Sequence, residues 1–313
     1  MARCEIKNGT NLDNYIIKDC ISTGGGMSAV YLAQMAKNKR QVVLKVALTD
    51  ENGAAHEDVL LQREAELLKQ GELRHPGNVR LFPILLKNRR PQYVVRASSI
   101  SEEPWYMVME YLRGKSLKDE LKTISRYSLE WKLELFYRIL LPIAFLHSKG
   151  YAHRDIKPDN IMFRTPISKE VLPDPVFIDF ALASNGKDYS SIVMDSYTPG
   201  YASPERIINA MPAFGDSRGN MENVQASDIW SLGVVLYEML TGKVLLRGNK
   251  EKVKTTIIRQ QMKPTLPISG EKGKILAKFI HSMLNRDAEK RPRIGLVIDA
   301  LEQKFHPPHI DVQ

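Results

Sequence analysis

The chain has 313 residues, of which 43% are hydrophobic and 26% are charged, as expected for a folded protein of one large domain or two lobes. The longest apolar runs are far shorter than a membrane-spanning helix, and the first residues lack the apolar stretch of a signal peptide. Two cysteines exclude a disulfide framework, so we expect a cytoplasmic protein. The formal charge of +9 favours acidic partners, but the basic residues form no recognisable nucleic-acid-binding module, and nucleic acid is not an expected partner.

The first third of the chain is predicted to be mainly β-strand with one helix. Short β-rich segments cover residues 29–33 and 41–46, and further strands are expected near 79–82 and 106–109. A helix is predicted over 56–70, with apolar positions at helical spacing: Val59, Leu60, Leu67 and Leu68. The polar stretch 98–104 is expected to be a loop.

After Gly114 the pattern becomes helical. Helices are predicted over residues 117–124, 129–148, 227–241 and 273–284, and the second has a broad apolar face. Residues 209–225 are rich in small polar residues and are expected to form an irregular insertion.

Basic residues gather loosely near position 255, and a solvated face with a mild preference for acidic proteins is the interpretation that we favour. The members of this cluster are Lys250, Lys252, Lys254, Arg259 and Lys263. His306 and His309 are not expected to bind a metal.

The segment His153–Asn160 (HRDIKPDN) contains the residue types that phosphoryl transfer requires. This reaction needs phosphates and a metal ion held in place, and a hydroxyl nucleophile aimed in line. Asp155 suits the acceptance or orientation of a hydroxyl proton, Asn160 suits a magnesium ion, and Lys157 suits the charge on the transferred phosphate. Asp179 closes an apolar run and adds a carboxylate for the metal.

With these motifs the chain resembles the eukaryotic-type protein kinases over about residues 15–305. The resemblance implies an α+β, bilobal protein-kinase-like fold, with a small antiparallel β lobe that has one helix and a larger, mainly helical lobe. The implied parts are an N-terminal extension (1–14), a kinase N-lobe (15–112), a C-lobe (113–305) and a C-terminal tail (306–313). It also implies that Asp155 is the catalytic base and that Asn160 and Asp179 are metal ligands. The implied cofactors are ATP and Mg²⁺, with Mn²⁺ as an alternative.

The same resemblance assigns a nucleotide site. The run Thr23–Val30 (TGGGMSAV) looks like the loop that covers the phosphates, in a form similar to that of bacterial Ser/Thr kinases. Lys45 is expected to grip phosphates and to pair with Glu64, with Glu66 as the alternative. The segment Met109–Leu112 looks like the hinge between the lobes, where backbone groups of Glu110 and Leu112 would bond adenine. The residues expected to bind nucleotide are Gly24, Gly25, Gly26, Met27, Ser28, Val30, Val43, Lys45, Glu64, Met109, Glu110, Leu112 and Met162.

Two features resemble the Ser/Thr class of kinases and not the tyrosine class: Lys157 and the segment Tyr197–Glu205 (YTPGYASPE). The contacts implied are Thr198 with Asp155 and Lys157, Glu205 with Arg291, and Asp228 with the backbone of the catalytic loop. Breaking the pair of Glu205 with Arg291 should be strongly destabilising.

Arg154 precedes the catalytic aspartate, and in the family such an arginine often pairs with a phosphate on the activation segment, here residues 179–205. The candidate acceptors are Ser190, Ser191 and Ser196, with Tyr189 as a weaker one. The predicted function is therefore an ATP- and Mg-dependent protein serine/threonine kinase that acts on Ser/Thr acceptors of protein substrates, phosphorylates itself in trans and is regulated on this segment.

Two alternatives are considered. A pseudokinase scaffold would bind nucleotide without phosphoryl transfer. Four departures from the family's usual residues favour it: Thr23, Ser28 and Ala181 replace glycine, and Val43 replaces alanine. A small-molecule kinase would share the metal-binding chemistry but should lack the segment 198–205 and its partner Arg291.

Overall fold

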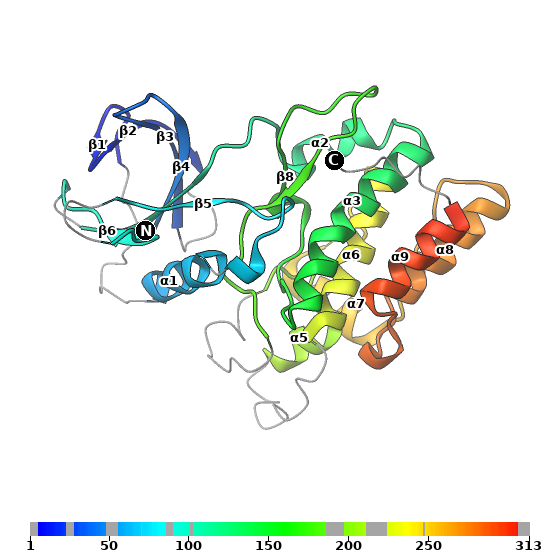
Figure 1. Cartoon of the computed structure of the whole chain (residues 1–313). Helices are drawn as coiled ribbons and strands as arrows, with labels where there is room; N and C mark the ends of the chain where they lie inside the picture. Colours follow the sequence, from blue (N-terminus) through cyan, green and yellow to red (C-terminus); the bar gives the residue numbers. More distant parts are fainter. Residues whose placement is uncertain are drawn as a thin grey trace. The chain divides into compact units, whose positions relative to one another are not determined.

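The computed structural model describes residues 6–22, 28–47, 56–69, 71–85, 90–100, 103–185, 197–210, 224–246 and 248–305 (Figure 1). The chain forms two compact units: Met1–Arg74 with Val79–Leu112, and His75–Asn78 with Arg113–Gln313. The first contains an antiparallel sheet and a long helix, and the second is mainly helical, so the predicted fold class is confirmed. Within the described residues, none of the helices is long and apolar enough to cross a membrane.

The sheet of the first unit has the strand order β1-β2-β3-β4-β7-β5, with β6 also paired to β7. All these pairs are antiparallel. The strands are β1 (Asn11–Leu12), β2 (Tyr15–Ser22), β3 (Ser28–Met35), β4 (Gln41–Ala47), β5 (Leu81–Phe82), β6 (Val94–Arg96) and β7 (Trp105–Glu110).

One face of this sheet contains the core of the first unit. Residues directly opposite each other on antiparallel strands point to the same face, and Leu44 lies opposite both Tyr31 and Val108. All three side chains are at most 1% exposed and belong to one hydrophobic cluster. Burial of each aliphatic member contributes roughly 1.5–3 kcal/mol, so this face determines the register of the strands.

Helix α1 (His56–Lys69) forms where the sequence predicts a helix, but its buried face differs from the prediction. Val59, expected on the apolar face, is 49% exposed, and that prediction is wrong. The buried positions are Leu60, Leu61, Glu64, Ala65 and Leu67. Because Glu64 lies in the middle of this stripe, a pattern of apolar residues alone could not place its centre.

The second unit is built from helices and one short hairpin. In Figure 1, α3, α6, α8 and α9 run alongside one another, and contacts join α3 to both α6 and α9, and α6 to α8. The elements are α2 (Leu117–Ile124), α3 (Leu129–Ser148), η3 (Pro158–Asn160), β8 (Ile161–Phe163), β9 (Pro175–Phe177), α5 (Pro204–Asn209), α6 (Val224–Thr241), α7 (Lys250–Arg259), α8 (Gly270–Met283), η5 (Ala288–Lys290) and α9 (Ile294–Phe305).

The helices predicted at 117–124 and 129–148 are confirmed at both ends. Ser116 and Ser128 explain why α2 and α3 begin where they do, because each hydroxyl accepts a backbone N–H of the first turn. The predicted helices at 227–241 and 273–284 both begin earlier, at Val224 and Gly270. Most of the insertion predicted at 209–225, together with His306 and His309, lies outside the described residues.

Candidate active site

In the first unit, Lys45 and Glu64 form a buried ion pair. Lys45 lies opposite Val30 and Met107 in the sheet, so these side chains share the face turned away from the hydrophobic core. Its Nζ donates to Glu64 Oε2 at 2.6 Å, and the Glu64 residue is fully buried. A charge pair in such a position orients the lysine, because neither group can leave without stranding the other.

The structure distinguishes the two glutamates that the sequence left open. Glu66 is only two residues from Glu64, but its side chain is 58% exposed and it accepts a hydrogen bond from Lys69 at 2.6 Å. On a helix, a shift of two residues turns a side chain away from the buried face. Lys45 therefore pairs with Glu64, the expected partner, and not with the alternative Glu66.

The other residues expected near the nucleotide take varied positions. Val30 and Val43 are half-buried, Met109 and Leu112 are buried, and Ser28 begins β3. Met162 is half-buried on β8 of the second unit. Gly24, Gly25, Gly26 and Met27 lie outside the described residues.

The structure adds a detail at Glu110. Its backbone N–H donates to the carbonyl of Arg80 at 2.9 Å, and its carboxylate accepts the N–H of Arg80 at 2.9 Å. A ligand that bonds this segment would therefore have to use backbone groups other than the N–H of Glu110.

In the second unit, three side chains predicted from the sequence converge on the carboxylate of Asp155. Asp155 Oδ2 accepts hydrogen bonds from Lys157 Nζ at 2.7 Å and Asn160 Nδ2 at 2.9 Å. Asp155 Oδ1 accepts one from the hydroxyl of Thr198 at 3.0 Å, and Lys157 Nζ also donates to that hydroxyl at 3.0 Å. The implied contacts of Thr198 with Asp155 and Lys157 are confirmed. A carboxylate fixed from several sides in this way is well placed to orient a proton donor.

Asn160 and Asp179 are brought together by the backbone. The N–H of Ile178, the residue before Asp179, donates to the carbonyl of Asn160 at 3.1 Å, next to the paired strands β8 and β9. The amide nitrogen of Asn160 donates to both the carbonyl and the carboxylate of Asp155, each at 2.9 Å, so its amide oxygen faces the other way. One carboxylate and one amide oxygen suit a hard cation such as Mg²⁺, whose other ligands are phosphates and water.

Asp228, on the buried helix α6, holds the chain next to Asp155. Its carboxylate accepts the backbone N–H groups of His153 at 2.7 Å and Arg154 at 2.8 Å, as the sequence implied. It also bonds Nε2 of His147, on α3, at 2.9 Å. Arg154 has a φ of 67°, which is unfavourable for a residue with a side chain, so these bonds stabilise a strained backbone.

Burial alone would raise the pKa of Asp228, but the hydrogen bond from His147, the nearby His153 and the N–H of Arg154 outweigh it, and the pKa lies below its ordinary value. The carboxylate therefore stays ionised at neutral pH. The stability that it contributes is present above the pKa of an unfolded aspartate, about 3.9, and is lost as the pH falls through the folded value.

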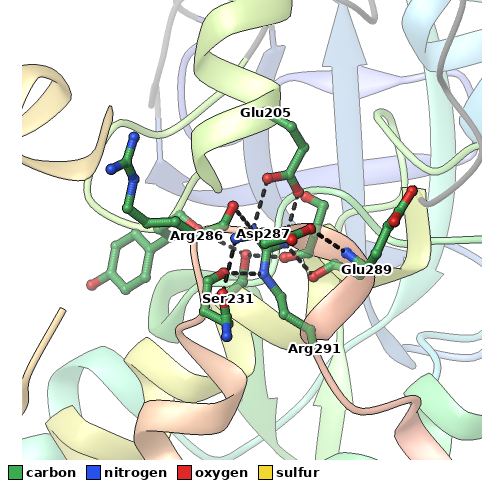
Figure 2. Close-up of polar contacts among 10 residues, drawn as sticks. Glu205, Ser231, Arg286, Asp287, Glu289 and Arg291 are labelled. Atoms are coloured by element: carbon green, nitrogen blue, oxygen red, sulfur yellow. Dashed lines mark hydrogen bonds and ion pairs between the residues drawn. The ribbon is translucent and has the colours of Figure 1, made fainter. Parts of the chain in front are cut away.

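The segment 197–205 is also attached to the helical body by side-chain hydrogen bonds. The hydroxyl of Tyr201 donates to Glu238 at 3.0 Å, and Arg291 makes two hydrogen bonds to Glu205 at 2.7 and 2.8 Å (Figure 2). The pair of Glu205 with Arg291 is thereby confirmed, although the Glu205 side chain is 33% exposed. Sequence reasoning missed Glu238, and its signal was an acidic residue within the apolar helix α6.

The fully buried ring of His153 lies 5.1 Å from the ring of Phe177 and 4.9 Å from that of Phe180. This burial lowers the pKa of His153 despite the carboxylates of Asp228, Asp155 and Asp179 nearby. The folded protein therefore resists a proton that the unfolded chain accepts. The stability associated with neutral His153 is present above the unfolded pKa, about 6.5, and falls as the pH drops below it.

We predict that His153→Phe, which keeps an aromatic ring between Phe177 and Phe180, makes the stability less dependent on pH between 7 and 5. The substitution removes a pH-dependent loss of stability that amounts to at most about 1.4 kcal/mol per pH unit for one proton. Denaturant unfolding of both proteins at several pH values measures this effect. If the stability of the two proteins fell equally between pH 7 and pH 5, the prediction would be contradicted.

The protein kinase domain family matches residues 21–305, and the chain therefore belongs to this family. A calcium/calmodulin-dependent protein kinase type 1 of Macrobrachium nipponense is 26% identical over 280 residues, covering 89% of this chain and 72% of the relative. The serine/threonine-protein kinase PknD of Chlamydia felis is 29% identical over 253 residues, covering 73% of this chain and 24% of the relative. The human serine/threonine-protein kinase ULK1 is 28% identical over 306 residues, covering 94% of this chain and 25% of the relative.

The chain thus spans a minor part of two of these three relatives. The sequence motifs predicted a eukaryotic-type protein kinase that resembles the bacterial Ser/Thr kinases, and this prediction is confirmed. The similarities also support the expected enzyme class, a protein serine/threonine kinase.

Proposed function

We propose that the protein transfers the terminal phosphoryl group of ATP to serine and threonine side chains of proteins, with Mg²⁺ as the cofactor or Mn²⁺ in its place. The observation that carries this proposal is the Asp155 carboxylate, bonded at once by Lys157, Asn160 and Thr198. The relatives named serine/threonine-protein kinases support the choice of acceptor.

In this proposal Asp155 orients the acceptor hydroxyl and takes its proton as the oxygen attacks the terminal phosphorus, while the bond from that phosphorus to the bridging oxygen breaks and ADP leaves. Lys157, bonded to Asp155 and Thr198, adds positive charge beside the transferred group. Asn160 and Asp179 would hold the metal ion, which supplies charge neutralisation on the phosphates. Thr198 fixes the position of the carboxylate before substrate arrives, so less reorganisation is required during the reaction.

The residues of the first unit are proposed to bind the nucleotide. Lys45 would hold its phosphates, oriented by Glu64. The other proposed contacts of this unit are the loop residues Gly24, Gly25, Gly26, Met27 and Ser28, the apolar residues Val30, Val43 and Met109, and the backbone of Glu110 and Leu112. Met162 of the second unit is a further proposed contact. Regulation by phosphorylation of the activation segment, self-phosphorylation in trans and a cytoplasmic location are parts of the same proposal. The candidate acceptors Ser190, Ser191, Ser196 and Tyr189 lie outside the described residues.

We predict that Glu64→Ala lowers kcat/KM for ATP at least about tenfold, the size of effect expected when one partner of a buried ion pair is removed. The reason is that Lys45 loses the group that orients it. Glu66→Ala is a matched control, since it removes the same side chain two positions away, from an exposed pair with Lys69 that is worth little. Steady-state kinetics with varied ATP measures both, and equal losses in the two variants would contradict the assignment.

The proposal is tested by incubating purified wild-type protein and Asp179→Ala with Mg²⁺, ATP and a generic acceptor protein, and mapping phosphosites by mass spectrometry. Phosphoserine or phosphothreonine with wild type alone supports it. Nucleotide binding without transfer to any acceptor would replace it with a pseudokinase scaffold.

A further inference from the structure

We propose that the first half of α7 is a docking surface for an acidic segment of the protein substrate, beside the site of phosphoryl transfer. This surface, called the α7 basic surface, consists of Lys250, Lys252 and Lys254 with the adjacent Tyr197. The inference rests on the proposed function and names its substrate class: serine or threonine acceptors flanked by aspartate or glutamate.

The charge of α7 is the first observation. The helix contains Lys250, Lys252, Lys254 and Arg259 against one acidic residue, Glu251. Lys250 and Lys252 are exposed, while Val253 and Ile257 hold the helix against the body. Lysines in the first turns of a helix are unfavourable to its stability, because they meet the positive end of the helix dipole. Helix stability therefore does not explain why three lysines gather there.

The position of α7 is the second observation, and it distinguishes this surface from an ordinary solvated face. Lys254 Nζ lies 5.9 Å from the centre of the Tyr197 ring, within the range of a cation–π contact. The next residue, Thr198, bonds both Asp155 and Lys157. Helix α7 also contacts α5, which follows this segment directly. Tyr197 of this surface is thus adjacent in the chain to Thr198, which bonds the carboxylate proposed to act on the acceptor hydroxyl.

The geometry of the helix brings two of the lysines together. Lys250 and Lys254 are four residues apart, so they project from the same side of α7, whereas Lys252 projects from another side of the helix. Lys254 Nζ lies 3.1 Å from Glu251 Oε1 and also contacts the ring of Tyr197, whereas the ammonium groups of Lys250 and Lys252 form no hydrogen bond or ion pair with the described residues. These two lysines are the groups that would meet a carboxylate of the substrate.

Acidic groups near this surface do not cancel its charge. Glu238 is 1% exposed and accepts the hydroxyl of Tyr201, so it presents no carboxylate to a ligand. Burial also raises the pKa of Glu238. Asp159 is exposed in the catalytic segment, but it is a single charge against the three lysines of α7. An acidic partner therefore meets a net positive surface at α7.

The experiment uses three peptides with one serine acceptor, flanked by acidic, neutral or basic residues, and measures kcat/KM together with binding by fluorescence anisotropy. The wild type should prefer the acidic peptide over the neutral one about five- to tenfold, as expected for one or two exposed ion pairs, and high salt should reduce this preference. Lys250→Glu/Lys252→Glu should abolish the preference through KM, with the rate on the neutral peptide unchanged.

The matched control is Lys272→Glu/Lys274→Glu. These lysines have the same spacing and exposure in the first turns of α8, a helix that contacts α6 instead of α5. The control should keep the preference of the wild type. Equal behaviour of the two double variants, or a wild type without preference in rate or binding, would overturn the inference.

Two further outcomes separate the alternatives. If the acidic peptide binds wild type but not Lys250→Glu/Lys252→Glu, and no peptide is phosphorylated, the docking surface stands and the proposed kinase activity fails. If the double variant loses binding to anionic lipid vesicles but binds the acidic peptide like wild type, the surface recognises membranes and the inference is wrong.

Discussion

Replacing Asp155 with asparagine is expected to lower the rate of phosphoryl transfer about 10²–10⁴-fold, the range that a general base contributes. Asparagine keeps the size of the side chain, and its oxygen can still accept from Lys157 or Thr198. It cannot take a proton from an acceptor hydroxyl, and it removes the negative charge that faces Lys157 Nζ at 2.7 Å. The loss should therefore appear in kcat, with little change in the affinity for ATP.

Asp159→Asn is the matched control for this prediction. It makes the same chemical change four residues further on, at an exposed position of the same segment. Initial rates with a serine peptide, nucleotide affinity by calorimetry and thermal unfolding should be measured for both variants. If Asp155→Asn retains more than about a tenth of the wild-type rate, Asp155 is not the general base, because one such group is worth at least 10²-fold.

The second unit shows why its part of the site could be predicted from the sequence. Asp155, Lys157 and Asn160 lie within six consecutive residues, so their mutual geometry depends on local backbone conformation. The adjacency of Asn160 and Asp179 required the pairing of β8 with β9, which the apolar run before Asp179 suggested but did not determine. Thr198 was placed only by resemblance, because nothing in its local sequence indicates a contact across more than 40 residues.

The first unit shows where pattern reasoning fails. The apolar spacing of α1 was assigned to a face that includes Val59, because the pattern took account of apolar residues only. In the structure the ion pair with Lys45 makes Glu64 a core residue, and the whole buried stripe turns with it. A buried charge is invisible to a hydrophobic pattern unless its partner on another element is known.

Helices α5, α7 and α9 were not predicted, and the reasons differ between α5 and α7. Helix α5 is six residues long, too short for a periodic signal. Helix α7 has only two buried apolar residues among its charges, so tertiary contacts and the cap at Asn249 define it. The capping bond from Lys252 N–H to Asn249 at 2.9 Å is the local signal that sequence reasoning did not use.

The second large effect is expected for Asp228→Ala, which should lower the free energy of unfolding by about 3–5 kcal/mol. Asp228 is fully buried and accepts three hydrogen bonds, from the backbone of His153 and Arg154 and from the ring of His147. Alanine leaves these donors buried without an acceptor, and Arg154 loses a bond that holds its φ of 67°. Catalysis should fall even at temperatures where the variant is folded, because the backbone next to Asp155 is no longer fixed.

Asp228→Asn and Asp299→Ala make this prediction specific. Asparagine retains one acceptor oxygen, so it should lose less stability than alanine, whereas Asp299 is exposed on α9 and its removal should change stability by less than about 0.5 kcal/mol. Denaturant unfolding measures stability, and rates on a serine peptide measure activity at a temperature where all three variants are folded. If Asp228→Ala were as stable and active as Asp299→Ala, the carboxylate of Asp228 would not be what holds the catalytic segment, and the conformation around Asp155 would have to be maintained by its own bonds to Lys157, Asn160 and Thr198.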